Sequence, residues 1–103
     1  MTTHSLQIRI DANHPALPGH FPGRPVVPGV LLLDRTIAAA EAWLGRELHV
    51  VGLPQVKFTT PLLPDETATV DLALGTGELR FEIRRAEDRI AQGVLKLAEE
   101  PAR

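Results

Sequence analysis

Two residues with acid–base side chains, His20 and Asp34, lie fourteen positions apart in a segment rich in glycine and proline. The segment reads GHFPGRPVVPGVLLLD from position 19 to position 34. An imidazole can accept a proton near neutral pH, and a carboxyl group in apolar surroundings tends to stay protonated and can donate one. The pair therefore suits the elimination of a leaving group beside a carbonyl.

Two elements must position this pair. Residues 19–29 contain three glycines and three prolines, which suit neither a helix interior nor a central strand, so we expect a rigid loop that carries His20. A long apolar run follows from Val30, and Gly45 is well placed to end it, which predicts a helix of about four turns starting near Gly29. The first amides of such a helix are unpaired, so the Gly29 amide could bind a carbonyl oxygen.

Asp34 falls in the second turn of this helix, in a wall that is otherwise apolar and consists of Val30, Leu31, Leu33, Ile37 and Ala38. Such a wall disfavours the charged carboxylate, so Asp34 is a candidate to stay protonated while His20 accepts a proton. We expect the substrate to contact apolar residues around this pair, namely Phe21, Pro28, Val30, Leu33 and Ala38.

The segment from Gly19 to Asp34 closely resembles the active-site signature of the beta-hydroxyacyl-acyl-carrier-protein dehydratases of the FabZ and FabA type. The resemblance continues through Val56–Phe58 and Pro61–Asp65, which are similar to the strand and turn that follow the helix in that family. It implies that His20 is the catalytic base, that Asp34 serves the leaving hydroxyl and that the Gly29 amide polarises the thioester. It also implies an acyl carrier protein as partner and no cofactor.

The chain departs from that family at several positions. About eighteen residues precede Gly19, where the family normally has an extra helix and strand, and Ala38 stands where the family often has glutamine. No tyrosine is present, so the tyrosine gate of some relatives has no counterpart here. The short form is similar to the small dehydratases encoded with aryl-polyene and related polyketide systems.

The hydrophobic pattern predicts an α+β fold in one domain spanning residues 1–103. Between Val30 and Leu44 few side chains are strongly polar, so most of the helix should be wrapped by protein. Alternating or apolar segments predict the strands of a sheet that curls around the helix, at residues 5–11, 48–60, 68–74, 78–85 and 89–97. A helix enclosed by an antiparallel meander is the hot-dog arrangement, which the family resemblance also implies.

Composition narrows the classes of partner. A net charge of −2 with dispersed Lys and Arg provides no basic patch for nucleic acid. The longest apolar stretch is too short to span a bilayer, and without a signal-like start we expect a cytoplasmic protein. Cysteine is absent, and His4, His14 and His49 show no metal-ligand spacing, so no metal is expected.

Three functions remain open. The first is dehydration of a 3-hydroxyacyl thioester, carried on the pantetheine arm of an acyl carrier protein, to the trans-2-enoyl thioester. The second is a non-catalytic hot-dog subunit that completes a dehydratase heterodimer, which Ala38 and the short N-terminal segment favour. The third is thioester hydrolysis, which leaves His20 without a clear role. We also expect a homodimer or a higher oligomer, because the sheet is small and its edge strands need covering.

Overall fold

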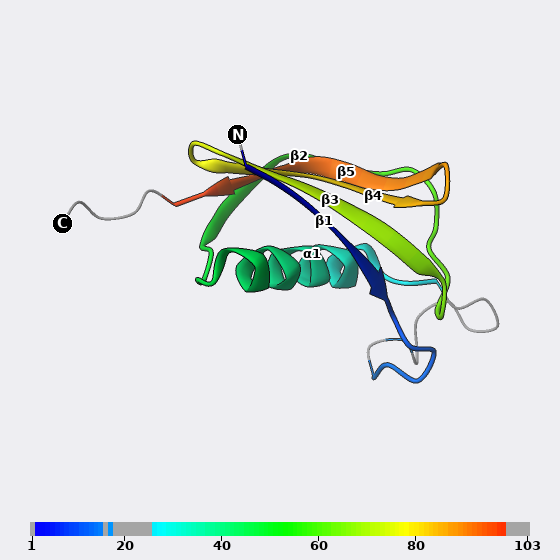
Figure 1. Cartoon of the computed structure of the whole chain (residues 1–103). Helices are drawn as coiled ribbons and strands as arrows, with labels where there is room; N and C mark the ends of the chain where they lie inside the picture. The colour runs from blue at the N-terminus through cyan, green and yellow to red at the C-terminus, as the bar shows by residue number, and fades with distance from the viewer. Residues whose placement is uncertain (1, 16, 18–25, 99–103) are drawn as a thin grey trace.

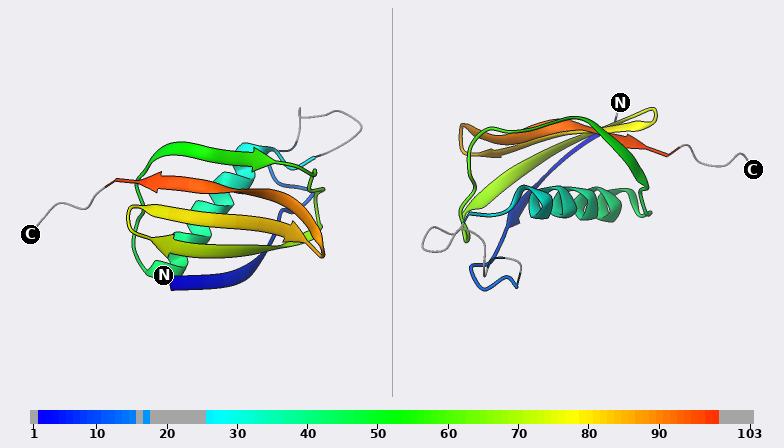
Figure 2. Two further views of the ribbon diagram at one scale, coloured as in Figure 1. Left: turned by 90° about the horizontal axis from the view of Figure 1, so that it is seen from above. Right: turned by 180° about the vertical axis from the view of Figure 1, so that it is seen from behind.

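The computed structural model describes residues 2–15, 17 and 26–98 of the chain. One helix and five strands follow one another in the order β1 (Thr2–Arg9), α1 (Gly29–Leu44), β2 (Val50–Phe58), β3 (Thr67–Gly75), β4 (Glu78–Arg85) and β5 (Asp88–Leu97). The strands form one antiparallel sheet in the order β1-β3-β4-β5-β2. Figure 1 shows α1 lying along one face of this sheet, and Figure 2 shows the helix crossing the strands diagonally.

The register of the central strands explains which face packs on the helix. Val70, Ile83 and Ala91 are aligned across β3, β4 and β5, and each side chain is almost fully buried. The neighbouring row, with Asp71, Glu82 and Gln92 in the same register, lies on the opposite face. Because strand side chains alternate between faces, the apolar alternation of Val70 with Leu72 in β3 and of Phe81 with Ile83 in β4 predicts this inward row, and the structure confirms it. The same alternation directs Arg80, Glu82 and Arg84 outward.

The predicted strand bounds were accurate where short turns join the strands and less accurate for the two edge strands. Strand β4 has the predicted bounds, whereas β1 covers residues 2–9 instead of 5–11. The chain leaves the sheet after Arg9 because Asp11 starts a turn, in which the Asn13 amide donates to Asp11 Oδ1 at 2.8 Å and the His14 amide to Asp11 O at 2.9 Å. The meander describes β3 to β5, but β1 and β2 lie at opposite edges.

Strand β2 is also shorter than predicted, at residues 50–58 instead of 48–60. At its start the Leu48 amide donates to Glu41 Oε2 at 2.8 Å instead of to a neighbouring strand. At its end Thr59 and Thr60 both donate to the carbonyl oxygen of Ile90. The register of β2 against β5 shifts twice between Val50 and Gln55, so the first half of this edge strand is irregular.

The helix has the predicted bounds, and one strip along it is exposed. It starts at Gly29 and ends at Leu44, with Gly45 as a left-handed cap at φ 69° whose amide donates to Glu41 O at 2.8 Å. Leu31, Leu32, Thr36 and Ala40 are buried. The exposed helix residues are Val30, Asp34, Arg35, Ala38 and Ala42, and the others are buried or half-buried, so most of the helix is covered as expected. In the described part of the chain, no helix has the length and apolar character needed to cross a membrane.

Candidate active site at the start of helix α1

The start of α1 lacks a capping side chain. Pro28 is the N-cap residue, with φ −60° and ψ 143°, and it has no side chain that can accept a hydrogen bond. Its carbonyl accepts from the Leu31 amide at 3.0 Å and from the Leu32 amide at 3.2 Å. The amides of Gly29 and Val30 precede these bonds, and no described side chain caps them. This helix start therefore has the free donors and the positive dipole end that suit a partly negative oxygen.

Four residues at helical spacing form an exposed strip along α1, which we call the α1 stripe: Val30, Asp34, Ala38 and Ala42. Val30 is 76% exposed, an unusual value for a residue of its type. Asp34 is the only charged member of the stripe, and within the described residues it has no ion pair. Asp34 is therefore an acid among apolar residues, one to two helical turns beyond the free amides of Gly29 and Val30.

The residues predicted to form an apolar wall around Asp34 differ in burial. Leu31, three positions before Asp34 and therefore its neighbour on the helix surface, is 8% exposed and belongs to the core. Leu33 and Ile37 are half-buried and pack against the edge of the core, while Val30 and Ala38 are exposed beside Asp34. Asp34 itself is exposed, so the described part of the chain does not enclose its carboxyl group in apolar side chains.

Two predicted site residues, His20 and Phe21, lie outside the described residues. Their positions relative to Asp34 and Gly29 therefore stay a prediction. Pro28 and Gly29 are half-buried at the helix start, as expected for residues that present backbone groups to a ligand. Among the described residues, no group of three His, Cys, Asp or Glu side chains is placed to hold a metal ion.

A pocket of about 390 Å³ opens beside the helix start. Its wall includes Pro28, Gly29 and Leu32 from the helix side, and Phe58 and Leu62 from the end of β2 and the connection to β3. The lining is mainly apolar. The Val27 amide donates to Leu62 O at 2.8 Å, which ties the segment before α1 to that connection. The pocket therefore joins the free helix amides to an apolar space that a hydrocarbon group can fill.

Phe58 is absent from the site residues predicted from the sequence. A side-chain carbon added at Gly29 would lie 2.8 Å from Cζ of Phe58 and 3.0 Å from two further ring carbons, so the ring covers the Cα of Gly29. Phe58 belongs to the Val56–Phe58 segment of the family resemblance, which was the available signal. Sequence spacing alone could not bring position 58 to position 29.

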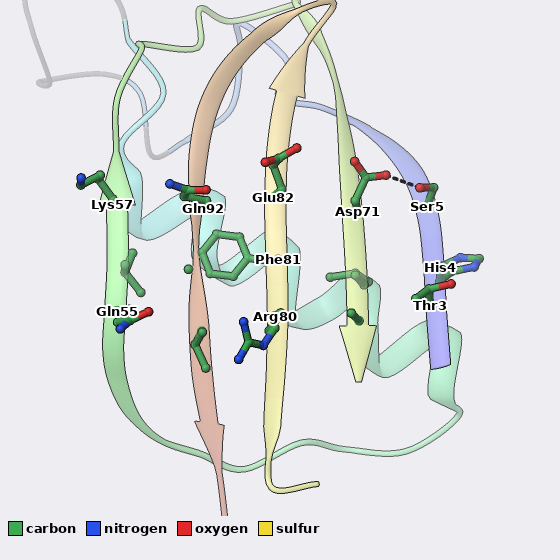
Figure 3. Close-up of a pocket in the computed structure, with 15 residues that line it drawn as sticks. Thr3, His4, Ser5, Gln55, Lys57, Asp71, Arg80, Phe81, Glu82 and Gln92 are labelled. Carbon is green, nitrogen blue, oxygen red and sulfur yellow. Dashed lines mark hydrogen bonds between the residues drawn. The ribbon is translucent and has the colours of Figure 1, made fainter. Parts of the chain in front are cut away.

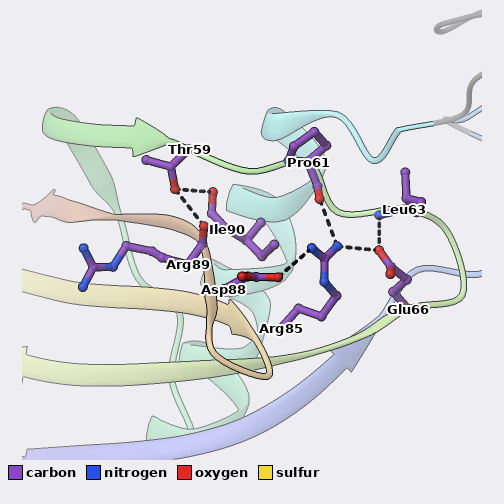
Figure 4. A network of polar contacts seen from close by, with 8 residues as sticks. All are labelled: Thr59, Pro61, Leu63, Glu66, Arg85, Asp88, Arg89 and Ile90. Carbon is purple, nitrogen blue, oxygen red and sulfur yellow. Dashed lines mark hydrogen bonds and ion pairs between the residues drawn. The ribbon is translucent and has the colours of Figure 1, made fainter.

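A polar network, drawn in Figure 4, binds Pro61, which is one of the residues that line the pocket. Arg85 donates to Glu66 Oε1 at 2.8 Å, to Pro61 O at 3.2 Å and to Asp88 Oδ2 at 3.3 Å. The Leu63 amide donates to Glu66 Oε1 at 2.8 Å, and this bond, together with Arg85, lowers the pKa of the Glu66 carboxyl group. The β2–β3 connection is therefore held by a carboxylate that stays ionised at neutral pH.

A larger hollow, of about 1130 Å³, lies on the face of the sheet that points away from α1 (Figure 3). We call this face the outer sheet face. Its two carboxylates pair within the chain: Asp71 accepts hydrogen bonds from Ser5 Oγ and, at 2.9 Å, from Arg84 Nε, while Glu82 accepts from Arg89 Nε at 3.0 Å. It includes none of the described site residues predicted from the sequence, so the smaller pocket beside Gly29 is the better candidate for the reaction.

Comparison with known proteins places these features in a family context. A family model described as ApeI-like, ApeI dehydratase, matches residues 1–94. The 3-hydroxyacyl-[acyl-carrier-protein] dehydratase FabZ of Thermus thermophilus is 35% identical over 101 residues, which are 87% of this chain and 65% of that protein. FabZ of Desulforamulus reducens is 33% identical over 70 residues, which are 61% of this chain and 49% of that protein. The chain thus spans between half and two-thirds of the length of these relatives.

Solved structures are similar over nearly the whole chain. A chain of the dehydratase heterocomplex ApeI:P from Xenorhabdus doucetiae superposes with a TM-score of 0.85 at 26% identity, covering 94% of this chain and 88% of that one. A probable thioesterase from Bartonella henselae superposes with a TM-score of 0.72 at 18% identity, covering 93% of this chain and 88% of that one. The second likeness shows the fold alone. Together they confirm the predicted hot-dog fold.

Proposed function

Because this chain belongs to the ApeI-like dehydratase family, we propose that it dehydrates 3-hydroxyacyl thioesters to trans-2-enoyl thioesters. The acyl group would be carried on the pantetheine arm of an acyl carrier protein, in a fatty-acid or polyketide type of synthesis. One observation carries the proposal: Asp34 lies on the exposed α1 stripe just beyond the uncapped amides of Gly29 and Val30, in a chain that also contains His20.

In the proposed reaction His20 removes the proton from the α-carbon of the thioester. The Gly29 amide donates a hydrogen bond to the thioester oxygen, where negative charge develops. The bond between the β-carbon and its hydroxyl group then breaks, and Asp34 gives its proton to the departing hydroxyl, which leaves as water. The electron pair of the broken C–H bond becomes the new double bond, so atoms and charge balance.

The exposure of Asp34 supports a shared site. A carboxyl group acts as an acid near neutral pH when apolar surroundings disfavour its charged form, and this chain leaves Asp34 open on the α1 stripe. The stripe and the edge of β2 carry exposed apolar side chains, including Val30, Val51 and Leu53. We propose that a second subunit covers these residues and contributes its own His20 beside Asp34.

A second candidate is a subunit that completes a heterodimer without catalysing the reaction. Two observations favour it: Ala38 stands on the α1 stripe where the resembling family often has glutamine, and the similar ApeI chain comes from a heterocomplex. Thioester hydrolysis has no comparable support, since the thioesterase likeness shows the fold alone.

The test is to incubate the purified chain with 3-hydroxyacyl-carrier proteins and to follow their masses. Loss of water by the acyl group supports dehydration, and release of the acyl group supports hydrolysis. In an active chain, His20→Ala and Asp34→Asn should each lower the rate at least roughly a hundredfold. His49→Ala and Arg35→Gln are matched controls, because both residues are exposed and lie outside the proposed site. No mass change with the chain alone, but loss of water after a second hot-dog protein is added, would favour the heterodimer.

Mixing the two inactive variants tests the shared site. A mixed dimer has one site with both defects and one site with an intact His20 and an intact Asp34. Random exchange makes about half of the dimers mixed, each with one good site of two, so activity should recover to roughly a quarter of wild type. A flat activity trace after proven exchange contradicts the shared site.

A further inference from the structure

The side chain of Phe58 faces the free amides of α1 from the end of β2. Its ring lies against Gly29 so closely that an added side-chain carbon would be 2.8 Å from Cζ. Real carbon contacts of this kind are essentially never so short, so a side chain at position 29 would require the Phe58 ring to move. Phe58 and Gly29 together lie in the wall of the pocket beside the helix start.

The backbone that carries Phe58 is held firmly. Phe58 pairs with Ala91 of β5, and the next amide, that of Thr59, donates to Ile90 O at 2.9 Å. The hydroxyl of Thr59 donates to Arg89 O at 2.8 Å, which adds a side-chain contact at the same point. Any movement of the ring must therefore come from rotation of its side chain and not from a shift of the strand end.

The ring itself is not held in the same way. It is 48% exposed, although an aromatic ring at a strand end could bury far more of its surface. Behind it, Leu62 is fully buried, and Leu32 is 2% exposed. The ring therefore stands between solvent and an apolar floor, next to the amides that would receive a thioester oxygen.

A ligand that places its carbonyl oxygen at the Gly29 amide and its hydrocarbon chain in the pocket must pass this ring. The pocket holds about 390 Å³, near the lower end of the roughly 300–1,000 Å³ typical of small-molecule sites. Removal of the ring would extend this space, whereas a larger ring would reduce it.

We propose that Phe58 is a specificity-determining residue, whose ring sets the length of the acyl chain accepted beside Gly29. This inference rests on the dehydratase activity proposed above and adds to it the group that selects among 3-hydroxyacyl thioesters. The ring fills the space next to Gly29 in place of a longer chain and takes no part in proton transfer.

The experiment measures kcat/KM for pantetheine thioesters with a short, a medium and a long 3-hydroxyacyl chain. Phe58→Ala should raise the ratio of the long-chain to the short-chain value at least about tenfold, since one methylene group in an apolar pocket changes kcat/KM by roughly 10- to 200-fold. Phe58→Leu, which keeps apolar bulk, should shift the ratio in the same direction by less. Leu63→Ala is the matched control, because Leu63 is similarly exposed at 45% and does not line the pocket.

A second pair of variants tests the contact itself. Gly29→Ala should lower activity, because its new methyl group meets the Phe58 ring, and Gly29→Ala combined with Phe58→Ala should recover at least about tenfold of that loss. An unchanged length ratio in both Phe58 variants, or no recovery in the double variant, overturns the role of Phe58.

Binding of unreactive thioether analogues of the same chain lengths, followed by calorimetry, separates this inference from the activity. Wild-type chain that forms no enoyl product, with Phe58→Ala binding long analogues more tightly, contradicts the dehydratase activity and supports the length-selecting role. If the chain forms enoyl product but the Phe58 variants keep the wild-type length preference in rate and binding, the dehydratase activity is supported and the role of Phe58 is contradicted. Neither product nor binding contradicts both.

Discussion

The outer sheet face differs from the α1 stripe and the β2 edge in whether its side chains have partners within the chain. On the outer sheet face, charged side chains such as Asp71 and Glu82 have partners within the chain. On the α1 stripe and the β2 edge, Val30, Val51 and Leu53 are more than half exposed, and Asp34 has no ion pair within the described residues. The carboxylates of the outer sheet face thus have partners in the isolated chain. The α1 stripe and the β2 edge instead expose apolar side chains and an acid that has no ion pair within the described part of the chain.

This difference indicates that the larger of the two hollows is not the better candidate for a binding site. The larger hollow lies on the satisfied face, where open, polar and mutually paired groups have little to gain from a ligand. The smaller pocket lies beside free helix amides and an apolar floor, where a thioester can replace missing contacts. The proposed site therefore rests on groups that have no partner among the described residues and not on the volume of the hollow.

The largest expected effect comes from separating β2, which carries the exposed Val51 and Leu53, from β5. An added side-chain carbon at Gly93 would lie 2.2 Å from the carbonyl oxygen of Gln55 and 2.9 Å from Cα of Val56, both backbone atoms that cannot easily move. Gly93→Ala should lower the free energy of unfolding by about 3 kcal/mol or more, measured by urea denaturation.

Gly52→Ala is the matched control on the same pair of strands. Its new methyl group would lie 3.7 Å from Cβ of Lys96, an ordinary van der Waals contact. We expect a change within about 0.5 kcal/mol. Equal stability of the two variants would show that β2 and β5 do not approach each other as closely as described here.

A smaller effect is expected from placing a charge on each surface in turn. Leu53→Asp puts a carboxylate on the β2 edge, where Leu53 is 51% exposed, and should weaken subunit association at least about tenfold because the charge would be buried without a partner. Thr3→Asp, on the outer sheet face, should leave association unchanged. Sedimentation at micromolar concentrations measures both, and a wild-type monomer throughout that range would contradict the assembly.

The smallest effect concerns pH. The hydrogen bond from Ser5, followed by the bond and charge of Arg84, lowers the pKa of the Asp71 carboxyl group. A folded-state pKa below the unfolded value stabilises the protein fully above about pH 4, and the contribution is lost as pH falls through the lowered folded pKa. Because the Asp71 side chain is 34% exposed, solvent screens the interaction and the change should be small.

The melting temperature of wild type should therefore fall more steeply below about pH 4 than that of Asp71→Asn, which has no proton to gain. Ser5→Ala should give an intermediate slope, since Arg84 remains. Superimposable profiles for the three proteins would show that Asp71 has the same pKa in the folded and unfolded states.

Local signals in the sequence predicted the elements well. Gly45 marked the end of the helix, and alternation in β3 and β4 identified the inward row, because both depend on residues near one another in the chain. The bounds of β1 and β2 were less accurate, since Asp11 and Glu41 bind nearby amides in competition with the sheet. Such competition depends on side-chain positions that a hydrophobic pattern does not contain.

The candidate site was predicted in part. The uncapped start at Gly29 and the place of Asp34 on the helix followed from Pro28, Gly29 and the helical repeat. Phe58 could not be found in this way, because its contact with Gly29 joins the end of β2 to the start of α1. The apolar run on this helix is continuous, so the pattern did not show that Leu31 is buried while Val30 is exposed.

The pairing of β1 with β3 has a consequence for the order in which the molecule is assembled. Ser5 and Asp71, which are hydrogen-bonded across these strands, are 66 positions apart. A ribosome makes the chain from its N-terminus, so β1 emerges first and must wait for β3 before it can join the sheet. The sheet can therefore be completed only after β3 has been synthesised. Slow long-range pairing, not formation of the helix, should limit that step.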